Sequence, residues 1–248
     1  MRAIALEVQH CAKRFRSRKG RVQALQEVTF QVPAGAQCGL LGPNGAGKST
    51  LIRILANVLK PDAGQITVLG YPLRWGQHAY KRQVGFMLGD LGLMERLTGR
   101  EQLELAAQLY GLPPDQAAAR IETLTCPFEV ATALDRWIET YSNGMRRQLA
   151  FLLALLHRPR LIVLDEPFEA MDAQAIETAI DLLRAHNREG ATLLISSHRL
   201  DKLEPLCDYL VVLHRGRVRF AGPIATFRDH LPADDTLEAA YLRWLRTV

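Results

Sequence analysis

The chain has 248 residues, of which 48% are hydrophobic and 23% charged, and its formal net charge is +5. This composition is typical of a globular protein with enough apolar material for a sizeable core. The longest apolar run, residues 149–156, is far shorter than the roughly 20 residues that a membrane-spanning helix needs. The first residues also lack the apolar core of a secretory signal. We therefore expect a cytoplasmic protein without a membrane span.

The four cysteines, Cys11, Cys38, Cys126 and Cys207, are scattered without a C-x-x-C pair. Neither a zinc site nor a disulfide framework is indicated, and we predict reduced, mostly buried thiols. The modest positive charge would suit a surface that faces anionic lipid, and it gives no reason to expect a nucleic-acid partner. The densest basic run, residues 13–21, predicts a solvated hairpin loop, with a contact to phosphate or membrane as the alternative.

In chain order, the first third contains short apolar segments separated by turn residues. They predict strands at residues 4–8, 28–32, 37–41, 65–69 and 83–88. Helical periodicity dominates from residue 97 to about 156, which we interpret as a helical insert. Beyond it, strand and helix alternate, which predicts a mostly parallel sheet with helices on both faces. The elements predicted there are strands at 161–164, 192–196, 209–213 and 217–221 and helices at 173–186, 200–206 and 236–245.

The most informative motif matches G-x-x-x-x-G-K-[ST] between a strand-like segment and a helix-like one. Glycines let successive backbone N–H groups turn toward one anion, and the following helix adds the positive end of its dipole. Lys48 supplies charge for the β- and γ-phosphates, and the Ser49 hydroxyl supplies a ligand for Mg²⁺. The motif therefore predicts a nucleoside triphosphate site made of Gly42, Pro43, Asn44, Gly45, Ala46, Gly47, Lys48, Ser49 and Thr50.

Two further polar positions follow predicted strands. The strand at 161–164 ends in Asp165 and Glu166, and His198 follows the next strand along the chain. Because ligand sites in open α/β sheets lie at the carboxyl ends of strands, we expect Asp165 to hold Mg²⁺ and Glu166 to act as general base toward the attacking water. His198 is predicted to contact the γ-phosphate. The alternatives are a solvated cap for the two acids and a structural role for the histidine.

A third motif, Tyr141-Ser142-Asn143-Gly144-Met145, precedes an apolar helix. Taken alone, it is better interpreted as an ordinary helix cap than as an anion site. Together, however, the motifs resemble the ATPase subunit of ATP-binding cassette (ABC) transporters in order and spacing, over roughly residues 4–245. The segment 42–50 matches the Walker A motif, 141–145 the signature and 161–166 the Walker B motif. Asp172 matches the D-loop, and His198 the switch histidine.

This resemblance implies an α/β P-loop NTPase core of the ABC ATPase type, with a mostly parallel sheet, an antiparallel β part at the N-terminus and an inserted helical subdomain. The whole chain, residues 1–248, would form one such domain, with the helical subdomain at about 90–157. Phe15 would stack on adenine, with Phe30 a less suitable rival. The implied cofactors are ATP and Mg²⁺.

In the family, two subunits form a head-to-tail dimer, with each ATP between the Walker A motif of one subunit and the signature of the other. Ser142 and Gly144 would then touch the γ-phosphate in trans. A homodimer is expected and a heterodimer stays open. Nucleotide-driven closure and opening would act on membrane-spanning permease partners, which places the chain on the inner face of the cell membrane.

Several departures from the usual family pattern are informative. The signature is usually Leu-Ser-Gly-Gly-Gln, and the version found here is similar to that of exporters whose permease is a separate chain of the ABC-2 kind. Segments 91–101 and 236–242 also resemble that branch. The glutamine that usually follows the strand at 84–88 is replaced by Gly89, and we hypothesise that the next residue, Asp90, serves as a Mg²⁺ ligand in its place. Phe168 stands where threonine is commoner.

These features predict an ATP-hydrolysing subunit that powers export through a separate ABC-2-like permease. The alternative is a soluble ABC ATPase that acts on ribosomes or DNA, although such relatives usually carry two cassettes or a long coiled-coil insert. A P-loop kinase is disfavoured by the signature and by the pair Asp165-Glu166. The cargo is not indicated, and import stays open.

Overall fold

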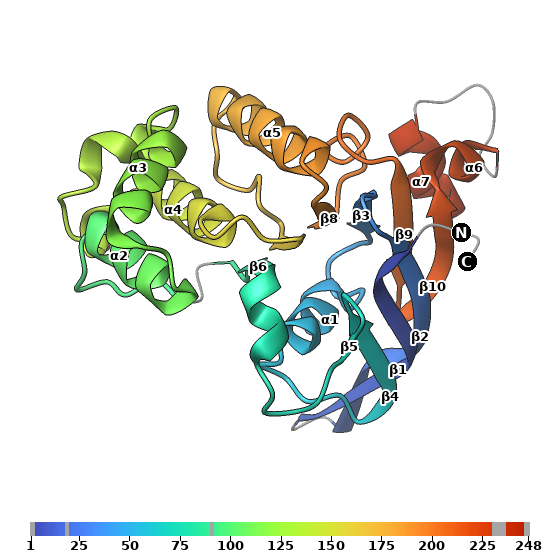
Figure 1. Ribbon diagram of the computed structural model, residues 1–248. Coiled ribbons are helices and arrows are strands. Elements are labelled where there is room, and N and C mark those ends of the chain that lie inside the picture. Colours follow the sequence, from blue (N-terminus) through green and yellow to red (C-terminus); the bar gives the residue numbers. More distant parts are fainter. Residues whose placement is uncertain (1–2, 18–19, 90–91, 230–236, 246–248) are drawn as a thin grey trace.

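The computed structural model describes residues 3–17, 20–89, 92–229 and 237–245. It contains two β-sheets, with a group of helices beside them (Figure 1). The predicted fold class is confirmed, since the sheet at the N-terminus is antiparallel, the second sheet is mostly parallel, and helices are inserted between two of its strands. No helix of the described ranges combines the length and the hydropathy that crossing a membrane requires.

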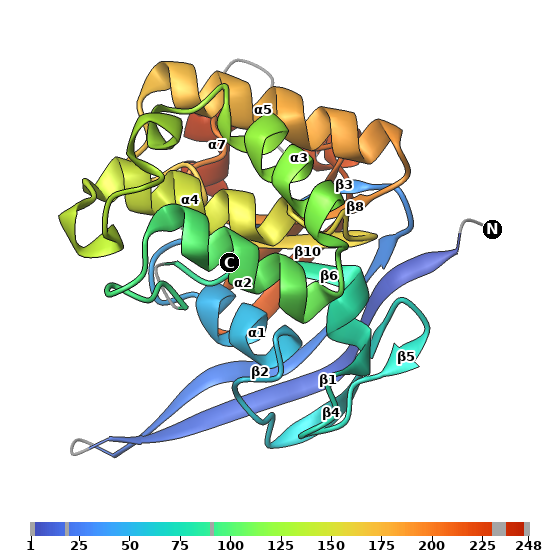
Figure 2. The same cartoon turned by 60° about the vertical axis from the view of Figure 1, so that its left-hand side comes forward.

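The antiparallel sheet has the strand order β2-β1-β4-β5. Its first two strands form a long hairpin that extends away from the rest of the molecule (Figure 2). The prediction of short strands with a solvated loop over residues 13–21 was wrong, because β1 continues to Ser17 and β2 begins at Gly20. Backbone pairing satisfies the main chain there while basic side chains such as Arg14 and Arg16 stay exposed. The strands are β1 (Ile4–Ser17), β2 (Gly20–Pro33), β4 (Ala63–Val68) and β5 (Tyr71–Pro72).

The second sheet has the strand order β10-β9-β3-β8-β7-β6. Strand β3 runs parallel to both β8 and β9, and β7 runs parallel to both β6 and β8, while β10 is antiparallel to β9. The carboxyl ends of β3, β7 and β8 therefore meet at one edge of the sheet, where the three predicted polar motifs begin. The strands are β3 (Gln37–Leu41), β6 (Val84–Met87), β7 (Leu161–Asp165), β8 (Thr192–Ser197), β9 (Tyr209–His214) and β10 (Arg217–Pro223).

The parallel sheet separates two hydrophobic cores. Alternate residues of β7 face opposite sides, because side chains of a strand point alternately to the two faces of its sheet. Leu161 and Val163 join the core that contains α1 and the antiparallel sheet, whereas Ile162 and Leu164 join the core that contains α4 and α5. The helices are α1 (Lys48–Leu55), α2 (Gly99–Tyr110), α3 (Pro114–Thr125), α4 (Asn143–Leu155), α5 (Ala173–Arg188), α6 (Ile224–Arg228) and α7 (Leu237–Trp244).

Most predicted elements of the second half are confirmed within a few residues, but the predicted helix at 200–206 is wrong. This segment forms consecutive turns, although Leu200, Leu203 and Leu206 are buried as their spacing suggests. Pro205 lies inside this segment and has no backbone N–H to donate, which interrupts a continuous helix. The sequence reasoning also missed two short elements, β5 and α6.

The cysteines are free, and all except Cys126 are buried, as predicted. Burial raises the pKa of the Cys11 thiol to about 11, which keeps it protonated at neutral pH. Two predictions about residues 90–91 and 236, the role of Asp90 and the first residue of the last helix, lie outside the described residues.

Candidate nucleotide-binding site

The glycine-rich loop connects β3 to α1, which confirms the predicted strand–loop–helix context. Gly47 is the N-cap residue of α1 and has a φ of 109°, a conformation that residues with a Cβ rarely adopt. A Cβ at Gly47 would lie 2.6 Å from the carbonyl oxygen of Ala24, and one at Gly42 would clash with the carbonyl oxygen of Leu213. Glycine at these two positions therefore lets the loop pack closely between β2 and β9.

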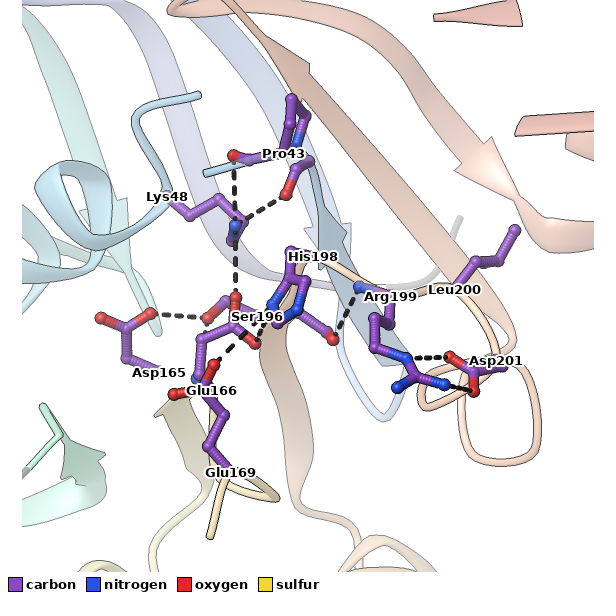
Figure 3. A network of polar contacts seen from close by, with 12 residues as sticks. Pro43, Lys48, Asp165, Glu166, Glu169, Ser196, His198, Arg199, Leu200 and Asp201 are labelled. Atoms are coloured by element: carbon purple, nitrogen blue, oxygen red, sulfur yellow. Dashed lines mark hydrogen bonds and ion pairs between the residues drawn. The ribbon is translucent and has the colours of Figure 1, made fainter. Parts of the chain in front are cut away.

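Lys48, the first residue of α1, lies across the loop (Figure 3). Its side chain is only 6% exposed, and its Nζ donates hydrogen bonds to the carbonyl oxygens of Gly42 at 2.7 Å and Pro43 at 3.4 Å. Nζ also lies 3.2 Å from Oε1 of Glu166, which follows β7. The lysine ammonium thus joins the loop after β3 to the acidic end of β7.

A cavity of about 440 Å³ lies against the glycine-rich loop. One end is formed by the hairpin, where Phe15 is 39% exposed, and the other end by the loop and the start of α1. Phe30, the rival candidate for base stacking, is buried in the core. An exposed aromatic ring at one end and backbone N–H groups with a lysine at the other can hold a nucleobase and its phosphates. The lining residues are Phe15, Val22, Gln23, Ala24, Asn44, Gly45, Ala46, Gly47, Lys48, Ser49, Thr50, Glu166 and Glu169.

The carboxylate of Asp165 is fixed by a serine on the neighbouring strand. Asp165 and Ser196 are register partners in β7 and β8, and the Ser196 hydroxyl donates to Oδ1 of Asp165 at 2.6 Å. The same hydroxyl accepts a hydrogen bond from the backbone N–H of Glu166 at 3.0 Å. Sequence reasoning gave Ser196 no role, although its place at the carboxyl end of a strand beside β7 could have indicated one.

Glu166 and His198 lie together at this edge of the sheet. Oε1 of Glu166 faces Lys48, and Oε2 lies 3.3 Å from Nδ1 of His198 (Figure 3). Glu166 also has a φ of 48°, in the left-handed region that non-glycine residues avoid. Such strain is common at functional sites, where the surrounding structure holds it in place. The structure therefore brings together the three predicted catalytic side chains, Lys48, Glu166 and His198.

A further acidic side chain at this edge, Glu169, was missed by the sequence reasoning. Its Oε1 lies 3.8 Å from Nδ1 of His198, and its Oε2 lies 3.5 Å from Nη2 of Arg147, on helix α4. Glu169 also lines the cavity beside the glycine-rich loop. No local pattern marks this residue, because its neighbours come from distant parts of the chain.

The remaining predicted site residues make local contacts. The Ser142 hydroxyl accepts from the N–H of Met145 at 3.1 Å and caps α4, and the Asp172 carboxylate accepts from the N–H of Ala175 at 2.8 Å and caps α5. A Cβ at Gly144 would lie 3.0 Å from the carbonyl oxygen of Ala170. Among the described residues that line the cavity beside the glycine-rich loop, none is Ser142, Gly144 or Asp172. Ser142 thus has the helix-cap geometry that the motif alone predicts.

These features define a P-loop nucleoside triphosphatase: a glycine-rich loop before a helix, a lysine and a serine at the end of that loop, and an Asp-Glu pair at the end of a parallel strand. The family model described as "ABC transporter" matches residues 25–169 of the chain. The chain belongs to the ABC transporter family and is an ATP-binding and ATP-hydrolysing subunit of that family.

Relatives of this family match most of the chain. It is 33% identical over 226 residues to the ABC transporter ATP-binding protein NatA of Bacillus subtilis, and this match covers 91% of this chain and 92% of the relative. It is 36% identical over 213 residues to the Nod factor export ATP-binding protein I of Mesorhizobium japonicum, and this match covers 86% of this chain and 63% of that protein. A solved ATP-binding subunit of an ABC transporter is 32% identical and superimposes with a TM-score of 0.87 over 96% of this chain and 98% of its own.

Proposed function

We propose that the chain powers export through a separate, ABC-2-like membrane permease. Two observations support export: the exporter-like signature Tyr141-Ser142-Asn143-Gly144-Met145 and the similarity to a Nod factor export protein. The observation that carries ATP hydrolysis is the contact of Glu166 with both Lys48 and His198 beside the glycine-rich loop. We further propose that residues 1–248 act as one ABC ATPase domain, with the helical subdomain at about 90–157.

ATP is expected to fill the cavity of about 440 Å³ with its adenine on Phe15 and its phosphates on the loop. The N–H groups of residues 44–50, at the positive end of α1, would surround the β-phosphate. The Lys48 ammonium would contact the β- and γ-phosphates in place of its present partner, Glu166. This exchange leaves the Glu166 carboxylate free beside the γ-phosphate.

The donor set at this edge fits Mg²⁺, which prefers oxygen ligands and usually binds one or two carboxylates together with substrate phosphates. Ser49 lines the cavity, and Asp165 keeps its second carboxylate oxygen after accepting the Ser196 hydroxyl at 2.6 Å. Ser49 and Asp165 would hold the ion, which supplies charge neutralisation for the transferring phosphoryl group. Ser196 orients the Asp165 carboxylate toward that position.

Glu166 is proposed to orient and deprotonate the water that attacks the γ-phosphate, because its carboxylate lies between the lysine and the histidine of the site. His198 would donate a hydrogen bond to the phosphoryl oxygens in the transition state, when their charge is dispersed. Both side chains follow strands of the rigid parallel sheet, which fixes their separation before the nucleotide binds.

The signature is proposed to act on the nucleotide of a second copy. Ser142 and Gly144 begin α4, whose N–H groups and dipole suit an anion, yet neither lines the phosphate cavity of its own chain within the described residues. A head-to-tail homodimer would place them, together with Asp172, against the γ-phosphate bound by the partner. Burial of two nucleotides closes this dimer, and hydrolysis reopens it.

The proposed location is cytoplasmic, peripheral to the inner face of the cell membrane and bound to membrane-spanning permease subunits, without a nucleic-acid partner. The test is a pull-down from detergent-solubilised membranes with tagged Glu166→Gln as bait, in the presence of ATP and Mg²⁺. A co-purifying multi-span membrane protein supports the transporter proposal. Ribosomal or DNA-repair proteins without a membrane chain would reject it in favour of a soluble ABC ATPase.

A further inference from the structure

We propose that Glu169 is a positioning residue for ATP hydrolysis that acts through His198. The inference rests on the proposed roles of Glu166 and His198, and it assigns a function to an acid that the sequence motifs leave out. Glu169 lies three residues after Glu166 and lines the same cavity. Three observations support this role: Glu169 lies beside the histidine ring, it pairs with an arginine of helix α4, and it lines the phosphate cavity.

Two carboxylates face the same ring nitrogen of the histidine. Nδ1 of His198 lies 3.3 Å from Oε2 of Glu166 and 3.8 Å from Oε1 of Glu169 (Figure 3). An Nδ1–H directed at these acids leaves Nε2 as the nitrogen that can face the phosphoryl group. If Glu166 turns toward the attacking water, its contact with the ring is lost. The Glu169 carboxylate, 3.8 Å from Nδ1, would then move in as the acceptor and keep the ring oriented during that step.

Glu169 is itself held from a distant part of the chain. Its Oε2 lies 3.5 Å from Nη2 of Arg147, on α4, and the next residue, Ala170, has a φ of 60° and presents its carbonyl oxygen to Gly144. The segment 169–170 therefore touches the first turns of α4 at two points. It connects the histidine ring to the helix whose N-cap is the signature Ser142.

Charge argues against a role of Glu169 in nucleotide affinity. Its side chain is half exposed and lines the cavity proposed for a triphosphate, so its negative charge opposes phosphate binding. An acid in this place does not strengthen ATP binding in the ground state. Its expected benefit lies in the transition state, through the orientation of His198, and such a group affects kcat rather than KM.

The test compares ATP turnover of the wild-type chain with Glu169→Gln, Glu169→Asp, His198→Ala and the double variant Glu169→Gln/His198→Ala. Glu169→Gln keeps the size of the side chain and removes its charge. Asp181→Asn is the matched control, since Asp181 is an exposed acid paired with Arg184 at a similar 3.4 Å on the surface of α5. Melting temperatures establish that each variant is folded.

We expect Glu169→Gln to lower kcat on the order of tenfold, with KM for ATP unchanged or reduced, because loss of an orienting partner typically costs ten- to a hundredfold. Glu169→Asp should recover most of the turnover. In single-turnover measurements the double variant should be no slower than His198→Ala, because Glu169 acts through the ring.

Two results would overturn the inference. One is a kcat of Glu169→Gln equal to that of the wild type and of Asp181→Asn. The other is a full additional loss when Glu169→Gln is combined with His198→Ala, which would show that Glu169 acts independently of the ring. By contrast, normal turnover of both Glu166→Gln and His198→Ala would count against the proposed catalytic roles themselves.

Discussion

The phosphate-loop region and the signature region differ in how their polar groups are used. In the first, Lys48 begins α1, Glu166 and His198 follow β7 and β8, and Glu166 contacts both of the other side chains beside a cavity. In the second, Ser142 caps its own helix, and Gly144 packs against Ala170. Under the proposed function, the first region is the assembled half of the ATP site, and the second is a helix N-terminus whose N–H groups suit an anion. This difference supports the proposal that the signature region of another copy completes the ATP site.

The largest effect on ATP turnover is expected for Glu166→Gln, which tests the catalytic role proposed for the phosphate-loop region. The amide cannot accept a proton from water, and general bases contribute about 10² to 10⁴ in rate. Turnover should fall by roughly that factor while binding of a fluorescent ATP analogue stays intact. Glu189→Gln, at the exposed C-cap of α5, is the control and should match the wild type. Near-normal turnover of Glu166→Gln would show that another group activates the water.

A second prediction concerns the far end of α4, the helix that Ser142 begins. Burial lowers the pKa of His157 from 6.5 to about 4. Between these values the unfolded chain binds the proton more tightly, so the free energy of unfolding falls as the pH is lowered through this window, by up to about 3 kcal/mol. Above pH 6.5 this contribution is fully present.

His157→Phe keeps a ring that can stack on Tyr110, where the two centroids are 3.6 Å apart. We expect this variant to lose less stability than the wild type between pH 7 and pH 4.5 in urea unfolding. A change at the exposed His78 should leave the wild-type pH dependence in place. An identical pH dependence for His157→Phe and wild type would mean that other groups dominate acid destabilisation.

A third prediction tests the hairpin end of the assembled half. Phe15→Ala removes the exposed ring proposed to stack on adenine, and stacking of a base on an aromatic side chain is worth about 1–3 kcal/mol. ATP affinity should weaken by about five- to a hundredfold, with a smaller change in kcat. Tyr71→Ala, which removes another exposed aromatic ring from the same sheet, is the control. Equal ATP affinities of Phe15→Ala and wild type would show that the adenine does not stack on Phe15.

The smallest effect on the isolated chain is expected for Ser142→Ala. Loss of the N-cap hydroxyl should cost about 1 kcal/mol of stability. ATP binding to a monomer should not change, because the cavity of the same chain is lined by other residues among those described. Turnover should nevertheless fall, since the proposed dimer places this hydroxyl against the partner's nucleotide. Thr98→Ala, which removes the comparable N-cap hydroxyl of α2, is the control and shows how much of the loss follows from losing a helix cap alone.

The sequence predicted those parts of the site that local motifs encode. The strand–loop–helix context of residues 42–50, the acids that end β7 and the histidine after β8 needed only motif spacing and the rule on strand ends. Ser196, the partner of Asp165, could have been found by applying the same rule on strand ends to β8. Glu169 could not be predicted, because its partner Arg147 lies in a distant element. Tertiary placement decides such contacts.

The same limit explains the errors in the fold. Charged residues at 13–16 suggest a loop, yet they form a strand because the partner strand β2 supplies their backbone hydrogen bonds. Conversely, the apolar spacing of 200–206 suggests a helix, but the segment forms turns. Its regularly spaced leucines are nevertheless the residues that enter the core. Hydrophobic pattern predicted burial correctly in both halves of the chain. It predicted the backbone conformation of buried strands such as 37–41 and 161–164, but not that of segments 13–16 and 200–206.

The most direct test of the two-copy site is the mass of Glu166→Gln in solution with ATP and Mg²⁺, measured by light scattering after gel filtration. The account predicts a dimer of twice 27.8 kDa with ATP, and a monomer both without nucleotide and when Ser142→Ala and Gly144→Val are added. A particle of 27.8 kDa that holds ATP at full occupancy would contradict it, because bound ATP would then recruit no second copy to the site.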